Sequence, residues 1–143
     1  MTAMSESKIV FLSGRLSAAA RDFLQRALEE EGYGDMQTCY GDVLVRLYER
    51  DGLTVTELAR RSHRTKSTVS VLVDRLVAMG MVEKRASESD ARAVGVWLTA
   101  KGEAFRAVME RISDRLNERL LKGFTAAERT RLEYLLEMAL ANL

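Results

Sequence analysis

Apolar residues recur at intervals of three and four positions along most of the chain, which is the spacing of an amphipathic helix. One such stripe occupies residues 6–31, a second about 36–50 and a third about 100–122, and a glycine follows each of them closely. A fourth stripe follows residues 125–128, where Thr-Ala-Ala-Glu matches a helix-capping box. The pattern therefore predicts long helices at both ends of the chain and another one before its middle.

The centre of the chain predicts two helices joined by a tight turn. Thr54 and Glu57 form a second capping box, in which the hydroxyl and the carboxylate satisfy free backbone amides at a helix start. We expect a short helix over about 55–62, a turn at 62–64 and a longer helix over about 65–79. This arrangement is a helix-turn-helix.

After the helix-turn-helix, the hydrophobic period changes to two. Val94, Val96 and Leu98 alternate with other residues as in a half-buried strand, and residues 81–85 can pair with them. The segment 86–92 between them is polar and small, so the two strands are expected to form a β-hairpin with a long tip. A basic hairpin directly after a helix-turn-helix is a winged-helix arrangement.

These elements predict a mainly α (α+β) fold. It comprises a winged helix-turn-helix at 36–99, with a two-stranded β-hairpin as its wing, and dimerisation helices at 5–32 and 100–143. We expect one domain over residues 1–143, because this is an ordinary domain length. The middle part has its own core and cannot cover every outer stripe, so we expect the outer helices to pack on a second copy. The alternative is a monomer in which these stripes cover one another.

Composition excludes several classes of protein. Hydrophobic residues make up 47% of the chain and charged residues 30%, as in soluble globular proteins. No apolar run approaches about 18 residues, and the N-terminus lacks a full signal-peptide pattern, so we expect no membrane partner and a cytoplasmic location. One cysteine and one histidine offer no catalytic dyad, metal site or cofactor site, so we do not expect an enzyme. We expect Cys39 to be a buried, inert thiol, although the sequence leaves a redox role open.

The distribution of charge points to the middle of the chain. The formal net charge is only +1, yet residues 56–95 hold eight basic and five acidic residues. The outward face of the second helix begins with short polar side chains, which a helix needs to approach base edges in a major groove. We expect Asp74 on this face to pair with a nearby arginine. The residues expected to contact DNA are Arg64, Thr65, Lys66, Ser67, Thr68, Ser70, Val71 and Arg75 of the helix-turn-helix and Lys84, Arg85 and Arg92 of the hairpin.

Three segments carry a resemblance to a known family: ELARRSHRTKSTVSVLVDRLVAMGMVEKR, Asp90-Ala91-Arg92 and VGVWLTAKG. The chain resembles MarR-type winged helix-turn-helix transcriptional regulators, although His63 and Arg64 occupy turn positions often held by glycine and an apolar residue. The resemblance implies a ligand-responsive repressor that binds a pseudo-palindromic DNA operator as a homodimer. It also implies a small-molecule pocket, for which Met36 and Tyr40 are candidates.

Two alternatives stay open from the sequence. Arg92 either enters a minor groove of DNA or forms a local salt bridge with Asp90 that shapes the tip. The whole protein could instead be a winged-helix protein-interaction module without specific DNA binding. Such a module would be expected to lose basic residues from its recognition surface, and this chain keeps them. The sequence names neither the operator, the regulated genes nor the effector, and it does not distinguish a repressor from an activator.

Overall fold

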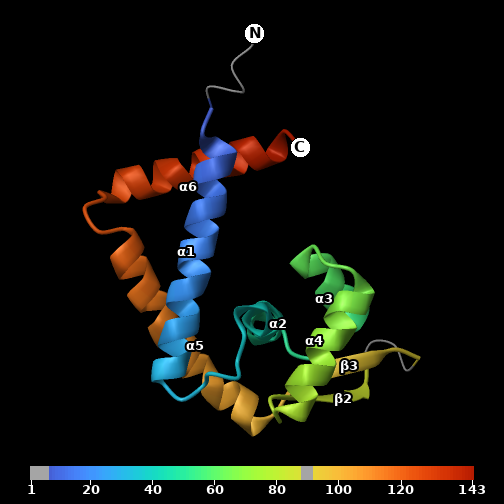
Figure 1. Ribbon diagram of the computed structural model, residues 1–143. Coiled ribbons are helices and arrows are strands. Elements are labelled where there is room, and N and C mark those ends of the chain that lie inside the picture. The colour runs from blue at the N-terminus through green and yellow to red at the C-terminus, as the bar shows by residue number, and fades with distance from the viewer. Residues whose placement is uncertain (1–6, 88–91) are drawn as a thin grey trace.

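Helices dominate the computed structural model, which describes residues 7–87 and 92–143. Within these residues α2, α3, α4 and the strands gather on one side, whereas α1 and α6 lie on the other (Figure 1). The helix α5 runs from the end of β3 to that second side. The elements in chain order are α1 (Ile9–Glu30), α2 (Thr38–Glu49), β1 (Leu53–Thr54), α3 (Val55–Ser62), α4 (Lys66–Ala78), β2 (Val82–Ala86), β3 (Val94–Leu98), α5 (Ala100–Leu120) and α6 (Ala126–Ala141).

Both predicted capping boxes are present. The Thr54 hydroxyl accepts a hydrogen bond from the Glu57 amide, and the Glu57 carboxylate accepts one from the Thr54 amide. Thr125 and Glu128 form the same reciprocal pair at the start of α6. These caps satisfy amides that a helix start leaves without partners, so they fix where α3 and α6 begin.

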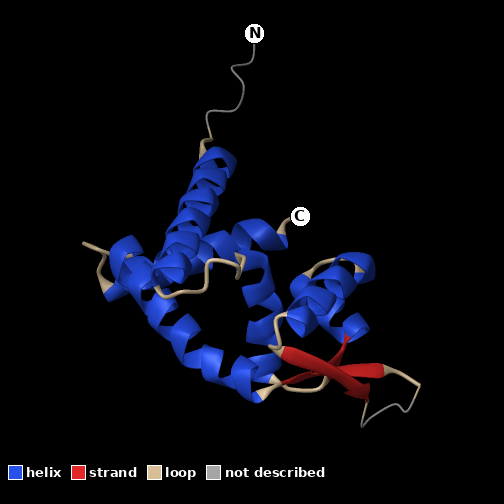
Figure 2. Ribbon diagram, turned by 60° about the horizontal axis from the view of Figure 1, so that its bottom comes forward, coloured by secondary structure: helices blue, strands red, loops and turns tan. Residues whose placement is uncertain are grey.

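The wing is a hairpin of β2 and β3, as the period-two pattern predicts, and it gains a third strand. The order in the antiparallel sheet is β1-β3-β2, with Val82 opposite Leu98 and Lys84 opposite Val96 (Figure 2). The strand β1 pairs Leu53 with Val96. The predicted two-stranded hairpin is therefore present, and β1 extends it to a three-stranded sheet. Since β1 has only two residues, it cannot show an alternating pattern, and only its pairing with β3 reveals it.

The core lies where α2, α3 and α4 meet the sheet, the end of α1 and the start of α5. The apolar stripe of each central helix faces inward, as predicted. The sequence predicted that the second helix begins at about residue 36, but α2 begins at Thr38, so Met36 lies just before it. The most deeply buried side chains include Met36, Val43, Leu44, Leu47, Leu58, Val69, Val73, Leu76 and Phe105.

The N-terminal end of α5 is joined tightly to the winged part. A Cβ at Gly102 would lie 2.0 Å from the Met81 carbonyl oxygen, so only glycine fits at this contact. The Lys101 ammonium donates to the Met79 carbonyl at 2.8 Å, and the Thr99 hydroxyl donates to the Gly80 carbonyl at 2.5 Å. The end of α4 and the start of α5 are thus held together.

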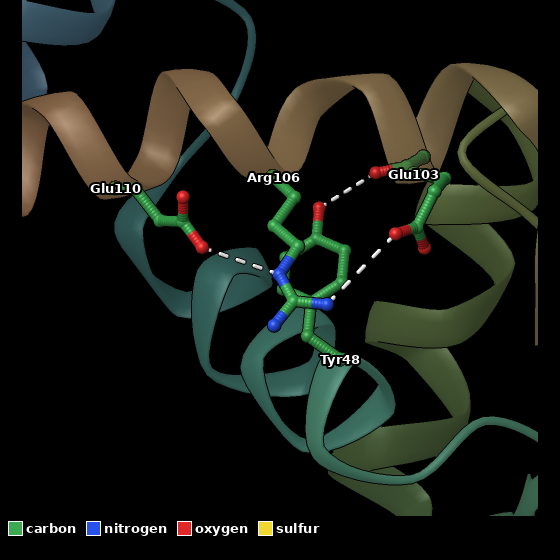
Figure 3. A network of polar contacts seen from close by, with 5 residues as sticks. Tyr48, Glu103, Arg106 and Glu110 are labelled. Carbon is green, nitrogen blue, oxygen red and sulfur yellow. Dashed lines mark hydrogen bonds and ion pairs between the residues drawn. The ribbon is translucent and has the colours of Figure 1, made fainter.

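Tyr48 of α2 makes a second connection to α5 (Figure 3). Its hydroxyl donates to the Gly102 carbonyl at 2.7 Å, and the Arg106 guanidinium lies over its ring at 5.5 Å from the centroid. Arg106 also pairs with Glu103 and Glu110. Burial, reinforced by the Glu103 carboxylate, raises the pKa of Tyr48 well above its usual value. The phenol therefore stays protonated and remains a hydrogen-bond donor.

Candidate nucleic-acid interface

The helix α4 separates an apolar inner face from a polar outer face. Val69, Val73 and Leu76 are completely buried. Ser67, Thr68, Val71 and Arg75 are exposed on the outer side, and Ser70 is half-buried. The predicted outward face is therefore exposed, with short side chains nearest the helix start.

The turn before α4 is closed by backbone conformation and a threonine cap. His63 ends α3 with a φ of +53°, in the left-handed region that glycine usually occupies. The Thr65 hydroxyl accepts from the Thr68 amide at 3.2 Å and donates to the Thr68 hydroxyl at 2.9 Å. Thr65 thus caps α4 and shapes the beginning of the outer face.

The basic residues around the turn differ in their partners. Arg64 forms an ion pair with Asp42 of α2, with its Nε 3.4 Å from a carboxylate oxygen. Lys66 and Arg75 are exposed and have no acidic partner within the part of the chain that the structure describes. Asp42 was not singled out from the sequence, because it lies on another helix and no local motif connects it to Arg64. Only the packing of α2 against the turn brings the two together.

The strand β2 directs its two predicted cations, Lys84 and Arg85, to opposite faces of the wing. The Lys84 ammonium lies 2.5 Å from the Asp74 carboxylate, so it faces α4. The Arg85 guanidinium lies over the Trp97 ring at 4.4 Å from the centroid and pairs with Glu83 at 3.0 Å. Successive side chains of a strand point to opposite faces, which accounts for this division. The expected partner of Asp74 is corrected from an arginine to Lys84.

Arg92 follows the wing tip and is exposed. Asp90, its predicted salt-bridge partner, lies outside the described residues. The structure therefore places Arg92 at the tip end of the wing, two residues before β3.

A cavity of about 240 Å³ lies between α1, α2 and α5. Met36 lines this cavity, as the resemblance implies for a ligand pocket. Tyr40 is buried in the core and is not among the residues that line the cavity. The Cys39 thiol is half-buried and contacts the Gln37 side-chain oxygen at 3.7 Å, so full burial of this thiol was a wrong expectation.

The described residues offer neither a cluster of metal ligands nor a membrane-spanning helix. Among residues 7–87 and 92–143, no three His, Cys, Asp or Glu side chains are grouped closely enough to hold a metal ion. None of the helices in the same ranges has the length and apolar character needed to span a membrane.

Known proteins share both the local sequence pattern and the fold. Residues 41–94 match the MarR family model. The HTH-type transcriptional repressor YetL of Bacillus subtilis is 35% identical over 82 residues, which cover 49% of this chain and 49% of YetL. The chain thus spans about half the length of this curated relative.

Solved structures extend the likeness over nearly the whole chain. A MarR protein from Peptoclostridium difficile has a TM-score of 0.84 at 24% identity, covering 99% of this chain and 91% of its own. A mutant MarR from Escherichia coli, in complex with operator DNA, has a TM-score of 0.82 at 27% identity, covering 92% and 93%. Residues 41–94 thus carry the pattern of the MarR family, and the fold around them is similar to that of solved MarR proteins.

Proposed function

We propose that the protein is a sequence-specific transcriptional regulator that binds double-stranded DNA. The observation that carries this proposal is the outer face of α4, where Ser67, Thr68 and Arg75 are exposed. Hydroxyl and guanidinium groups on such a helix form hydrogen bonds with base edges and phosphates in the major groove. The Escherichia coli relative was solved in complex with operator DNA, which supports the proposal that this protein binds DNA.

Each part of the interface has a distinct role in this proposal. Ser67, Thr68, Ser70, Val71 and Arg75 face the bases of the major groove. Thr65, Lys66 and Arg64 lie at the helix start, where backbone amides and the helix dipole favour phosphate. Lys84 and Arg85 border the wing on its two faces, and Arg92 reaches the adjacent minor groove.

We further propose that the protein acts as a homodimer, because its outer helices expose much apolar surface. No residue of α6 is buried. Exposed apolar side chains on α1 and α6 include Val10, Phe11, Leu12, Leu135, Met138 and Leu140. Large exposed apolar side chains gathered on two helices in this way are typical of an interface. A two-fold dimer would place two α4 helices about 34 Å apart and select a pseudo-palindromic operator.

The proposal includes repression and control by a small-molecule effector. Repression is supported by the likeness to YetL, which is named as a repressor. The effector is supported by the cavity beside Met36, which lies between the outer helices and the winged part. A compound that binds the DNA-incompetent arrangement more tightly would release the operator. A regulator of this kind must reach the chromosome, so the proposal includes a cytoplasmic location.

A competition assay tests the central claim. Fluorescence anisotropy compares a duplex from the promoter region of the protein's own gene with random duplex, at several salt concentrations. We expect tighter binding to the promoter duplex and a steep loss of affinity with salt, because phosphate contacts release counterions. Equal affinity for both duplexes would contradict specific regulation and favour the protein-interaction module.

A further inference from the structure

The outer face of the wing, which is the sheet face that carries Glu83, Arg85 and Trp97, is built over two glycines. A Cβ at Gly52 would lie 2.5 Å from Cζ2 of Trp97, and a Cβ at Gly95 would lie 2.9 Å from its Nε1. Any other residue at either position would therefore displace the indole. The ring fills the space that both glycines leave, and Trp97 is half-buried there.

The loop that carries Gly52 is tied to β3. The Gly52 amide donates to the Val96 carbonyl at 3.0 Å, and the Asp51 carboxylate accepts from the Leu98 amide at 2.9 Å. Gly52 has a φ of +74°, in the left-handed region that favours glycine. These contacts hold the loop against the indole, so Trp97 has a defined position on the sheet.

Arg85 reaches Trp97 across the space that Gly95 leaves open. Arg85 is directly opposite Gly95 in the hairpin, whereas Glu83 is directly opposite Trp97. A long side chain can contact a diagonal neighbour on the same face of a sheet. The guanidinium accordingly lies over the Trp97 ring at 4.4 Å from the centroid, with its Nε 3.0 Å from the Glu83 carboxylate. Two contacts therefore fix its direction.

The terminal nitrogens of Arg85 remain available to a ligand. The Glu83 carboxylate contacts Nε and the indole lies against the guanidinium, whereas the terminal N–H groups point outward in the guanidinium plane. Within residues 7–87 and 92–143, Glu83 is the one acidic partner of Arg85. The Arg85 side chain is 55% exposed, so an anion can reach it from solvent.

We propose that Trp97 is a positioning residue that holds Arg85 for contact with a DNA phosphate. A minor groove lies between two phosphate backbones, so a wing that enters it turns one face toward each backbone. Lys84 lies on the face beside α4, and Arg85 lies on the outer face. Arg85 therefore contacts the backbone that is farther from α4. The inference rests on the proposed function, because it assigns a role within the proposed contact between the wing and DNA.

Holding the guanidinium in advance favours this contact. A free arginine side chain loses rotamer freedom when it binds a phosphate, and that loss costs free energy. The contacts with Trp97 and Glu83 restrict Arg85 before DNA arrives, so less freedom is lost on binding. Removing the indole should therefore weaken DNA binding although it removes no charge.

NMR of the full chain without DNA tests whether the stack forms in solution. Protons that lie over the face of an indole are shifted upfield by its ring current. We expect the side-chain protons of Arg85 to lie upfield in the wild type and to return to ordinary positions in Trp97→Leu. Ordinary shifts for Arg85 in the wild type would overturn the proposal.

Duplex binding tests the positioning role, with anisotropy titrations of the promoter duplex and a random duplex. Trp97→Leu should weaken binding about twofold to fivefold, the effect of an exposed cation–π contact. Arg85→Gln should weaken it at least as much and lower the slope of log affinity against log salt by about 0.9, the value for one phosphate. In the Arg85→Gln background, Trp97→Leu should cause no further loss, because the two side chains act as one unit. Equal losses from Trp97→Leu in both backgrounds would show a merely structural role and overturn the proposal.

Two further variants separate displacement of the indole from its removal. Trp97→Phe keeps an aromatic face and should retain most of the affinity. Gly95→Ala keeps Trp97 and Arg85 but places a methyl group 2.9 Å from Nε1, so it should weaken binding as Trp97→Leu does. The matched control is Gly14→Ala on α1, whose added Cβ meets nothing within 4 Å and should change nothing. Circular dichroism checks that each variant folds. Wild-type affinity in Gly95→Ala, with the Arg85 signals displaced, would overturn the positioning role.

The two proposals fail separately. Phosphate contacts carry no sequence information, so the Arg85 contact can be measured on random duplex as well. If the wild type binds both duplexes equally, the proposed function is wrong, whereas the losses in Arg85→Gln and Trp97→Leu persist. If the wild type prefers its promoter duplex but both variants bind like the wild type, specific binding stands and only the role assigned to Trp97 and Arg85 is wrong.

Discussion

The winged part and the outer helices are both rich in apolar residues, yet they bury them to opposite extents. In α2, Val43 and Leu44 are fully buried, whereas Leu140 of α6 is 71% exposed. The core of the winged part is formed by α2, α3, α4 and the sheet, together with the end of α1 and the start of α5. The outer helices leave much of their stripes open to solvent. The difference shows that an amphipathic pattern predicts a helix but not what covers its apolar face.

The largest expected effect comes from breaking the core of the winged part. Leu44→Ala should lower the free energy of unfolding by about 2–5 kcal/mol, because it leaves a cavity in a fully buried site. Urea denaturation followed by circular dichroism measures this loss. The loss should persist at high protein concentration, where a dimer is saturated. A loss below about 1 kcal/mol would contradict the assignment of Leu44 to a tightly packed core.

The second effect concerns the exposed stripe of α6. Leu135→Glu should weaken self-association at least about tenfold, because it places a carboxylate in the proposed dimer interface. Sedimentation equilibrium measures the change, and circular dichroism checks that the helices persist. Glu137→Gln on the same helix is the control. A wild-type protein that is monomeric at micromolar concentration would remove the dimer from the proposal.

A smaller effect is expected at the wing. Arg92→Ala should weaken binding to the promoter duplex severalfold, because a guanidinium is lost from the proposed minor-groove contact. Anisotropy titrations give the affinity, and sedimentation should show an intact dimer. Arg129→Ala, which removes an arginine of α6, should leave DNA affinity unchanged. If Arg92→Ala also binds like the wild type, the wing arginine shapes the loop and does not contact DNA.

The smallest effect is a gain of affinity. Asp74→Asn should tighten duplex binding about twofold to threefold at low salt, because it removes a negative charge near the phosphates and frees Lys84. High salt should reduce this gain through screening. Asp22→Asn on α1 is the control. Weaker binding by Asp74→Asn would show instead that the ion pair positions Lys84 for its DNA contact.

Local sequence patterns predicted the helices and the hairpin well. They did not predict the contacts between helices and strands that are distant in the chain. The capping boxes at Thr54 and Thr125 need only residues three positions apart, so the sequence shows them directly. The strand β1 and the ion pair between Asp42 and Arg64 join segments distant in the chain. The sequence also predicted the wrong partner for Asp74, because strand pairing between distant segments decides that Lys84 is the wing cation that faces α4.

The sequence by itself determined the order of helices and strands, the ends of the helices and the polar outer face of α4. It could do so because propensity, capping and amphipathic period act over a few neighbouring residues. Only the tertiary structure decided that Arg64 pairs with Asp42 and that Lys84 and Arg85 lie on opposite faces of the wing. These arrangements depend on how distant segments pack together, and that packing leaves no periodic signal in the chain.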